Sequence, residues 1–288
     1  MKISRLGFRG YWDVLKSSFA QIGDSNLALV SAGVAFFSML SLFPALAALI
    51  AVMGLIADPA VVVAQMEDLR ELLPSDVFEI IHQQVVSLVS ASSDTLGWAG
   101  LVSLLLALWS ARAGVGAMII GLNSVYVQPN RNTAWHYLRA LVLTVALVGV
   151  GIVALISLVV IPVVLAFFPL GFVGTLLIDG LRWIVAAFVL FAGVGVLYRF
   201  GPNHKVARFR WLSAGAIVAV ALWVALSLAF SYYVTNFGNY NQVYGSIGAV
   251  VAMLIWLWIT SFLVLYGAAL NAQIDRWLKA NSPKPPLS

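Results

Sequence analysis

The chain has 288 residues, of which 62% are apolar and 9% are charged, and its mean hydropathy is +1.00. Soluble domains carry about 25% charged and about 45–50% apolar residues, so this composition excludes an ordinary soluble protein and predicts a bundle of transmembrane helices. Cysteine is absent, which excludes disulfides and thiolate metal sites. The net charge of +5 is spread over several short segments, which favours contact with anionic lipid over nucleic-acid binding.

Six segments of the chain are predicted to cross a membrane. A transmembrane helix needs about 20 mostly apolar residues to cover about 30 Å of hydrocarbon. The first predicted span is longer than the apolar core of a signal peptide, which has about 7–15 residues, so we expect it to be retained. Pro44 lies within it and is a candidate kink site. The six segments are 27–57, 96–122, 139–168, 176–199, 211–235 and 246–271.

The basic residues predict the orientation of these spans, because Lys and Arg accumulate on the cytoplasmic side. With the amino terminus inside, 13 of the 16 Lys and Arg residues fall in cytoplasmic segments, Arg70 and Arg182 fall outside, and Arg112 lies within a span. We therefore predict an all-α integral membrane protein with six transmembrane helices and both termini in the cytoplasm. The outer segment 58–95 is acidic instead and contains Asp58, Glu67, Asp68, Glu71, Asp76, Glu79 and Asp94.

The first 26 residues are predicted to form a helix on the cytoplasmic surface of the membrane. An amphipathic helix with basic residues on its polar face is typical of the membrane interface, and Arg9 and Lys16 supply such residues here. The apolar residues that recur at helical spacing in 8–22 are Phe8, Trp12, Leu15, Phe19 and Ile22.

The long outer segment 58–95 is predicted to form an amphipathic helical hairpin. Pro74 separates two helical patterns, and the second places Val77, Ile81 and Val85 on one side. Connections without structure of their own are seldom longer than about 12–15 residues, so we expect helices in this segment. After the last span, 272–288 is predicted to be a cytoplasmic tail that ends in a disordered segment.

The sequence motifs of soluble enzymes are absent: the chain has no GxxxxGK[ST] loop, HExxH helix or GxSxG elbow. Its three histidines, His82, His136 and His204, lie in three different loops, and His82 is on the opposite side of the predicted bilayer from the other two. A catalytic zinc site needs about three protein ligands at one point. We therefore expect no catalytic residues, no metal site and no cofactor.

Polar residues within the predicted spans are the candidates for a ligand cavity. A charge at the depth of Arg112 favours a position facing the bundle interior or water; the alternative is a place nearer the interface, from which the side chain reaches the head groups. Small residues at Gly114, Gly116 and Gly121 favour close helix packing. The neutral candidates are Ser38, Ser41, Ser110, Asn123 and Asn271.

An uncharged cluster, YYVTNFGNYNQVYGS (232–246), joins the outer ends of the fifth and sixth spans. Asn and Gly are typical of tight turns, so one interpretation is a compact turn. The other is that the amides and tyrosines of this cluster receive a sugar or lipid head group. The candidate contacts are then Asn236, Asn239, Tyr240 and Tyr244.

Four stretches form a pattern that runs along nearly the whole chain. They are SAGVAFFSMLSLFPAL (31–46), LWSARAGVGAMIIGLNSVY (108–126), LYRFGPNHK (197–205) and NFGNYNQVYGSIGAVVAMLIWLWITSFLVLYGAALNAQ (236–273). In this order they resemble the YihY/BrkB family of membrane proteins, whose members were once labelled ribonuclease BN. The resemblance implies a six-helix inner-membrane protein of bacteria and brings no settled biochemical activity. It also implies an acidic residue in a GAELNA-like stretch of the last span, where this chain has Ala269.

The old ribonuclease label can be compared with the residues present. Metal-assisted phosphodiester hydrolysis needs clustered carboxylates or histidines that hold ions and activate water. The predicted cytoplasmic side has no metal-ligand spacing among its candidates, and we therefore expect no ribonuclease activity. These candidates are Asp13, Asp24, Asp275, His136 and His204.

Two classes of function fit the sequence. In the first, the protein is a transporter or lipid-handling protein whose cavity is bounded by spans one, two, five and six. This cavity takes an anionic amphipathic ligand, so the expected partners are membrane lipids with anionic head groups. In the second, the protein is a structural scaffold of the cell envelope, and the acidic hairpin 58–95 contacts an envelope protein. Carboxylates are nearly absent from the spans, which disfavours an ion-coupled pump; no nucleic-acid partner is expected.

Overall fold

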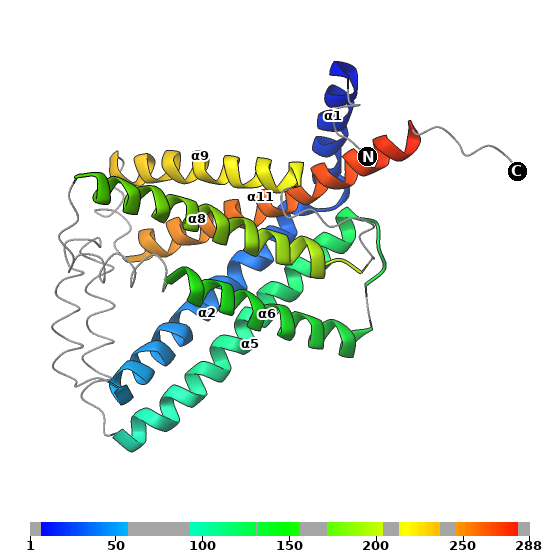
Figure 1. Cartoon of the computed structure of the whole chain (residues 1–288). Coiled ribbons are helices and arrows are strands. Elements are labelled where there is room, and N and C mark those ends of the chain that lie inside the picture. The colour runs from blue at the N-terminus through cyan, green and yellow to red at the C-terminus, as the bar shows by residue number, and fades with distance from the viewer. Residues whose placement is uncertain are drawn as a thin grey trace, which may run out of the picture. The chain divides into compact units, whose positions relative to one another are not determined.

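The computed structural model describes residues 7–56, 93–130, 132–155, 172–203, 213–236 and 246–281. Within these ranges the regular secondary structure is entirely α-helical, which confirms the predicted all-α class (Figure 1). The helices are α1 (Phe8–Asp24), α2 (Leu27–Ile56), α5 (Ser93–Val125), α6 (Thr133–Leu155), α8 (Phe172–Phe200), α9 (Ala214–Asn236) and α11 (Ser246–Ala280).

Each of the six apolar segments overlaps one of these helices, because a long uncharged run satisfies its backbone polar groups best within a helix. Helix α2 runs through Pro44 over its 30 residues. Helix α11 continues to Ala280, so the segment expected to be a tail begins with helix. The predicted hairpin lies largely outside the described residues, and 156–168 of the third segment and 282–288 of the carboxyl-terminal tail lie outside them too.

Three helical stretches are long and apolar enough to cross a membrane: Gly100–Val125, Thr133–Gly151 and Val250–Ala280. Arg9–Asp24 and Leu27–Leu42 form a fourth if this bent pair counts as one span. Two further apolar helices, Ile184–Phe200 and Ala214–Phe230, are shorter. By length and composition, the described chain therefore has three or four candidate spans, and the count of six and the cytoplasmic termini stay predictions.

Helices α1 and α2 meet at a bend of 63°. The N–H of Ser25 donates to the carbonyl of Gln21, and the N–H of Asn26 donates to the carbonyl of Gly23, which satisfies carbonyl groups at the end of α1. Asn26 has a φ of 50°, in the left-handed region where Asn is more common than most residues. The change of direction is therefore built into this two-residue connection.

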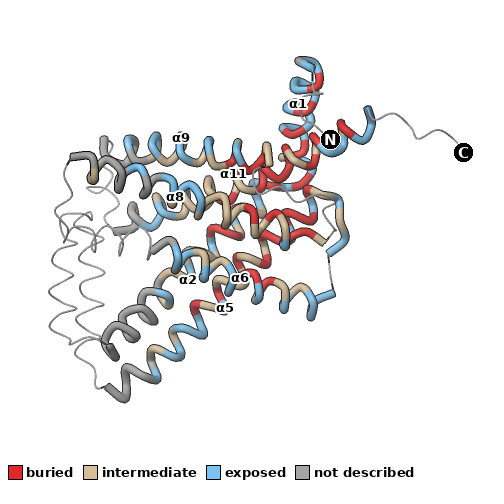
Figure 2. Tube along the Cα trace, viewed as in Figure 1, coloured by how far each residue is buried: buried red, intermediate tan, exposed pale blue. Residues whose placement is uncertain are grey.

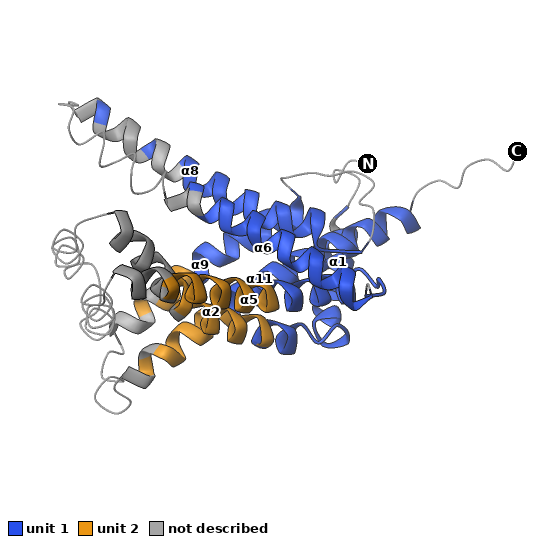
Figure 3. Ribbon diagram, turned by 90° about the horizontal axis from the view of Figure 1, so that it is seen from below, with its two compact units in different colours: residues 1–32, 115–226, 259–288 blue, residues 33–114, 227–258 orange. Residues whose placement is uncertain are grey.

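The described helices fall into two compact units (Figure 3). Unit 1 contains Met1–Ala32, Val115–Leu226 and Ile259–Ser288, and unit 2 contains Gly33–Gly114 and Ser227–Trp258. Helices α1, α6 and α8 belong to unit 1 alone, whereas α2, α5, α9 and α11 contribute residues to both units. Buried positions, red in Figure 2, are frequent in the later part of α11 and the end of α5, both in unit 1.

Helix α1 lies within residues 1–26, where a helix at the membrane surface is predicted, and has two distinct faces; its position at the membrane stays a prediction. Val14 packs with Leu270, Ile274 and Leu278 of α11, and these three residues share one face of that helix because they are four positions apart. This packing explains why α11 continues past the expected end of its span. The other face of α1 leaves large apolar side chains exposed, as a helix at a membrane surface requires; they are Tyr11, Trp12, Leu15 and Phe19.

Small residues allow close helix contacts inside unit 1. A Cβ atom on Gly215 of α9 would overlap the carbonyl oxygen of Gly267 of α11, and a Cβ atom on Gly267 would overlap the carbonyl oxygen of Gly215. At Gly121, which was singled out from the sequence, a Cβ atom would lie 2.9 Å from Leu265 and from Val30. Helix packing therefore accounts for these glycines.

Candidate functional site

The ten residues predicted to line a ligand cavity are distributed over both units. Asn123 and Asn271 belong to unit 1, whereas Ser38, Ser41, Ser110 and Arg112 belong to unit 2. Asn236 is the last residue of α9, and Asn239, Tyr240 and Tyr244 lie outside the described residues. The cavity bounded by spans one, two, five and six therefore stays a prediction.

In unit 2, the candidate residue Ser38 lies at a close approach of α2 and α5. A Cβ atom on Gly114 would be 3.5 Å from Phe37 Cβ and 3.5 Å from Ser38 Oγ. Ser41 donates its hydroxyl hydrogen to the carbonyl of Ser38 over 2.7 Å, a local bond within α2. Ser110 is 4% exposed, and Arg112 is half-buried on the same helix.

Asn123 of unit 1 is 1% exposed and joins two connecting segments. Its amide nitrogen donates to Asn130 Oδ1 over 2.9 Å, and its amide oxygen accepts a bond from the N–H of Asn203 over 2.7 Å. Asn203 also donates through Nδ2 to the carbonyl of Pro129 over 2.9 Å. Because both ends of the Asn123 amide are engaged, this side chain holds the segment after α5 against the segment after α8.

Asn271 is likewise tied to backbone and side chains of unit 1. Its Oδ1 atom accepts a bond from the N–H of Gly215 over 2.8 Å, and its Nδ2 atom donates to Ser213 Oγ over 2.9 Å. Ser213 Oγ in turn accepts a bond from the N–H of Ala216, so Ser213 caps α9. Ala269, where the family resemblance implies an acidic residue, is fully buried.

Tyr126 follows directly after α5 and contacts the same region. Burial raises the pKa of its phenol well above the ordinary value, the nearby Asp275 carboxylate raises the pKa further, and a hydrogen bond with Asn271 lowers it. The phenol therefore stays protonated at neutral pH and serves as a neutral polar group. Unit 1 thus encloses neutral hydrogen-bonding groups around Asn271.

The carbonyl group of Val125, at the end of α5, accepts hydrogen bonds from side chains of two other helices of unit 1. Gln21 of α1 donates through Nε2 to the carbonyl of Val125 over 2.6 Å, and Arg276 of α11 donates through Nη2 to the same oxygen over 3.1 Å. Gln273 Nε2 donates to Gln21 Oε1 over 2.8 Å. Since the last carbonyls of a helix have no partner within it, these side chains complete the end of α5.

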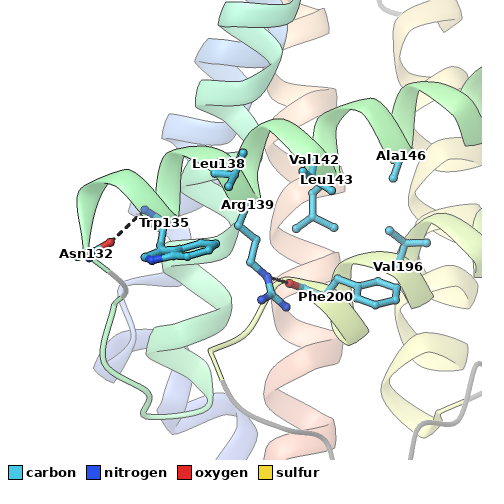
Figure 4. Close-up of a pocket in the computed structure, with 9 residues that line it drawn as sticks. All are labelled: Asn132, Trp135, Leu138, Arg139, Val142, Leu143, Ala146, Val196 and Phe200. Carbon is cyan, nitrogen blue, oxygen red and sulfur yellow. Dashed lines mark hydrogen bonds between the residues drawn. The ribbon is translucent and has the colours of Figure 1, made fainter.

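A groove of about 720 Å³ lies between α6 and α8 in unit 1 (Figure 4). Its walls are apolar, formed by Leu138, Val142, Leu143 and Ala146 of α6 and Val196 of α8. Its polar end is formed by Asn132, Trp135, Arg139 and Phe200. The groove therefore combines a long apolar wall with one cationic side chain, Arg139.

Arg139 is held in place by the end of α8. Its Nε atom donates to the carbonyl of Phe200 over 2.6 Å, drawn as a dashed line in Figure 4. Phe200 is the last residue of α8, so this carbonyl has no partner within its own helix. At the start of α6, Asn132 Oδ1 accepts a bond from the N–H of Trp135 over 3.0 Å and caps that helix.

The groove was not predicted from the sequence, because a basic residue at a span end, such as Arg139, is typical of a topology determinant. A signal was nevertheless present: Trp135, Arg139, Val142 and Ala146 follow one another at spacings of three and four residues, which places them on one helix face. Among the residues that the structure describes, there is no group of three or more His, Asp or Glu side chains that could hold a metal ion.

Comparison with known proteins identifies relatives along the whole chain. The family model described as virulence factor BrkB matches residues 18–287. A protein of Bacillus subtilis (strain 168) named as ribonuclease-like, YfkH, is 32% identical over 267 residues, covering 88% of this chain and 92% of that protein.

Shorter matches join the chain to proteins named UPF0761 membrane protein. The one from Idiomarina loihiensis is 30% identical over 102 residues, covering 35% of this chain and 34% of that protein. The one from Tolumonas auensis is 31% identical over 114 residues, covering 37% of each. No solved structure matches the chain significantly. The chain is therefore a membrane protein that belongs to the virulence factor BrkB family.

Proposed function

We propose that this BrkB-family protein binds an anionic amphipathic ligand in the inner membrane of a bacterium, as a transporter or lipid-handling protein. In this proposal all six apolar segments cross the membrane, both termini are cytoplasmic, and the protein is not an enzyme. The observation that carries the proposal is the groove between α6 and α8, with its apolar walls and the single cation Arg139.

The chemistry of this groove suits an acyl chain attached to an acidic head. Ligand sites are mostly apolar, with a few placed polar groups that fix the orientation of the ligand, and a guanidinium binds a phosphate or carboxylate through charge-assisted hydrogen bonds. A small hydrated ion is a poor match, because it needs rings of charges or carbonyls at close quarters. Asp179 is the one acidic residue in the six predicted spans, which disfavours a carboxylate proton relay.

The ribonuclease-like name of YfkH concerns that protein. In this chain, the carboxylates and histidines of the predicted cytoplasmic side have no metal-ligand spacing, which supports a role without phosphodiester hydrolysis. A scaffold of the cell envelope is the second candidate. It is favoured by the amides of Asn123 and Asn271, which are engaged in holding unit 1 together.

Two measurements on the full chain test the proposal. Native mass spectrometry of the detergent-purified protein is expected to show retained anionic lipid. Vesicles of phosphatidylglycerol and phosphatidylcholine that contain the protein are expected to show faster transbilayer movement of a fluorescent anionic lipid than empty vesicles, if the protein moves lipid. A protein that retains no lipid and leaves transbilayer movement unchanged would contradict the proposal and favour the scaffold.

A further inference from the structure

We infer that Arg139 binds the phosphate of a membrane phospholipid and that an acyl chain of this lipid lies along the α6–α8 groove. The inference rests on the proposed function and gives it a site and a ligand class. The groove was not among the regions that the sequence singled out, and its position between the third and fourth apolar segments differs from the cavity predicted there.

The guanidinium of Arg139 is oriented before any ligand arrives. Its Nε–H is bonded to the Phe200 carbonyl over 2.6 Å, which fixes the plane of the group at the polar end of the groove. A guanidinium has five N–H donors in a rigid fork, so the two terminal nitrogens offer a pair of parallel donors to a phosphate. Such preorganisation lowers the entropy cost of binding.

The partial burial of Arg139 strengthens an ionic contact. Its side chain is half-buried in the groove, where a charge pair is screened less than on an open surface. The groove contains one cation and its lining has no carboxylate. One positive charge therefore favours a head with one negative charge, and no group of the lining compensates the ammonium of a zwitterionic head. A phosphodiester lipid such as phosphatidylglycerol meets both conditions.

The apolar wall begins one turn beyond Arg139. Val142 and Ala146 follow it on the same face of α6, and Val196 faces them from α8 (Figure 4). At the polar end Trp135 is 63% exposed, and tryptophan is enriched at the level of lipid head groups. The order of Trp135, Arg139 and the apolar wall thus reproduces the order of interface, phosphate and acyl chain in one leaflet.

The test compares lipid retention by variants of the full chain in native mass spectrometry, with phosphatidylglycerol and phosphatidylcholine offered in equal amounts. Arg139→Gln is expected to lower retention of phosphatidylglycerol about tenfold, the effect of losing a charge-assisted contact, and Arg139→Lys to lower it less. Lys279→Gln, which removes an exposed charge from the last turn of α11, is the matched control and is expected to retain the lipid as the wild type does.

A second pair of variants addresses the acyl chain and leaves Arg139 in place, in case Arg139→Gln fails to fold. Ala146→Phe fills the apolar wall and is expected to lower lipid retention, whereas Ala221→Phe, at an exposed position of α9, is expected to leave it unchanged. A phosphatidylglycerol with a diazirine on its acyl chain is expected to cross-link to peptides from α6 and α8.

The outcomes separate the inference from the proposed function. Wild-type protein that retains phosphatidylglycerol, with retention unchanged in Arg139→Gln and Ala146→Phe, would overturn the site and leave the proposed function standing. Displacement of the lipid by excess inorganic phosphate would indicate a site for the free anion and would overturn the lipid assignment. Cross-linking between two copies of the chain at the groove, without lipid, would show that a second copy covers it and would also overturn the inference.

Discussion

The side-chain oxygen of Asn271 accepts a hydrogen bond from the backbone N–H of Gly215 over 2.8 Å, which joins the interior of α11 to the start of α9. One turn earlier on α11, the backbone of Gly267 lies directly against Gly215. Gly215 of α9 therefore makes both a hydrogen bond and a close backbone contact with α11, to residues one helical turn apart. The polar contact requires the close approach, and the glycines permit it.

Gly215→Ala is expected to destabilise the protein by about 1–3 kcal/mol, because the new Cβ atom would meet the carbonyl oxygen of Gly267, and backbone atoms cannot rotate away. Unfolding in mixed detergent micelles measures this change. Gly193→Ala on α8 is the matched control, since a Cβ atom there meets nothing within 4 Å. The control is expected to be neutral or slightly stabilising, because Ala is the better helix former. Equal stability of the two variants would contradict the contact.

Asn271→Leu is expected to lower stability by about 1–3 kcal/mol, because the N–H of Gly215 loses its acceptor in a buried place. Since both ends of the Asn271 amide are already bonded, lipid retention per folded molecule is expected to stay unchanged. Unfolding and native mass spectrometry on the same preparation measure the two quantities. Loss of lipid with stability unchanged would instead make Asn271 a ligand contact, as the sequence predicts.

Much of the fold follows from apolar run length. Every one of the six apolar segments overlaps a helix, since a backbone in hydrocarbon must satisfy its own polar groups. The predicted span ends at 271, where Asn271 and Asp275 interrupt the apolar run, whereas helix α11 continues to Ala280. The contact that continues the helix is with Val14, a residue far away in the sequence. The sequence nevertheless shows that Leu270, Ile274 and Leu278 are four residues apart, a spacing that places them on one helix face.

The candidate site was predictable only in part. The sequence selects Asn123 as a candidate for the ligand cavity, and the structure buries this residue, with 1% of its surface exposed; its role toward a ligand stays a prediction. Its partner Asn203 is 80 positions away, and no local pattern reveals such a pairing. The same holds for Arg139, whose partner Phe200 is 61 positions away. A lone arginine at a span end is typical of a topology determinant, so only the packing of α6 on α8 reveals a groove.

Helix α1 is expected to lie at the membrane surface with its exposed apolar face in the lipid. A nitroxide on Trp12→Cys or Leu15→Cys is expected to be more accessible to oxygen than to a water-soluble nickel chelate, because both positions are exposed on the apolar face. Ser17→Cys is the control at an exposed position of α1 outside the apolar face, and the label there is expected to be more accessible to the chelate than to oxygen. The chain has no native cysteine, so the nitroxide attaches only at the introduced cysteine of each variant. Equal access of the chelate to all three positions would place α1 in water.

The last prediction concerns topology, and it uses two positions that flank one helix. Gly100–Val125 of α5 is long and apolar enough to span the membrane, so positions 76 and 134, before and after it, are expected on opposite sides. The acidic character of 58–95 and the concentration of Lys and Arg in the segments predicted to be cytoplasmic predict that position 76 is outside and position 134 is inside. In cells with a permeabilised outer membrane, a membrane-impermeant maleimide is expected to label Asp76→Cys. Ala134→Cys is expected to react only after the inner membrane is opened.

Lys279→Cys provides the control for the carboxyl terminus, because Lys279 is exposed in the last turn of α11. It is expected to behave as position 134 does, since an even number of crossings separates the two in the six-span arrangement. Reaction of 76 and 134 from the same side would show that α5 does not cross the membrane. Reaction of 134 and 279 from opposite sides would require an odd number of crossings between them, and the six-span arrangement would then be wrong even if position 76 is outside.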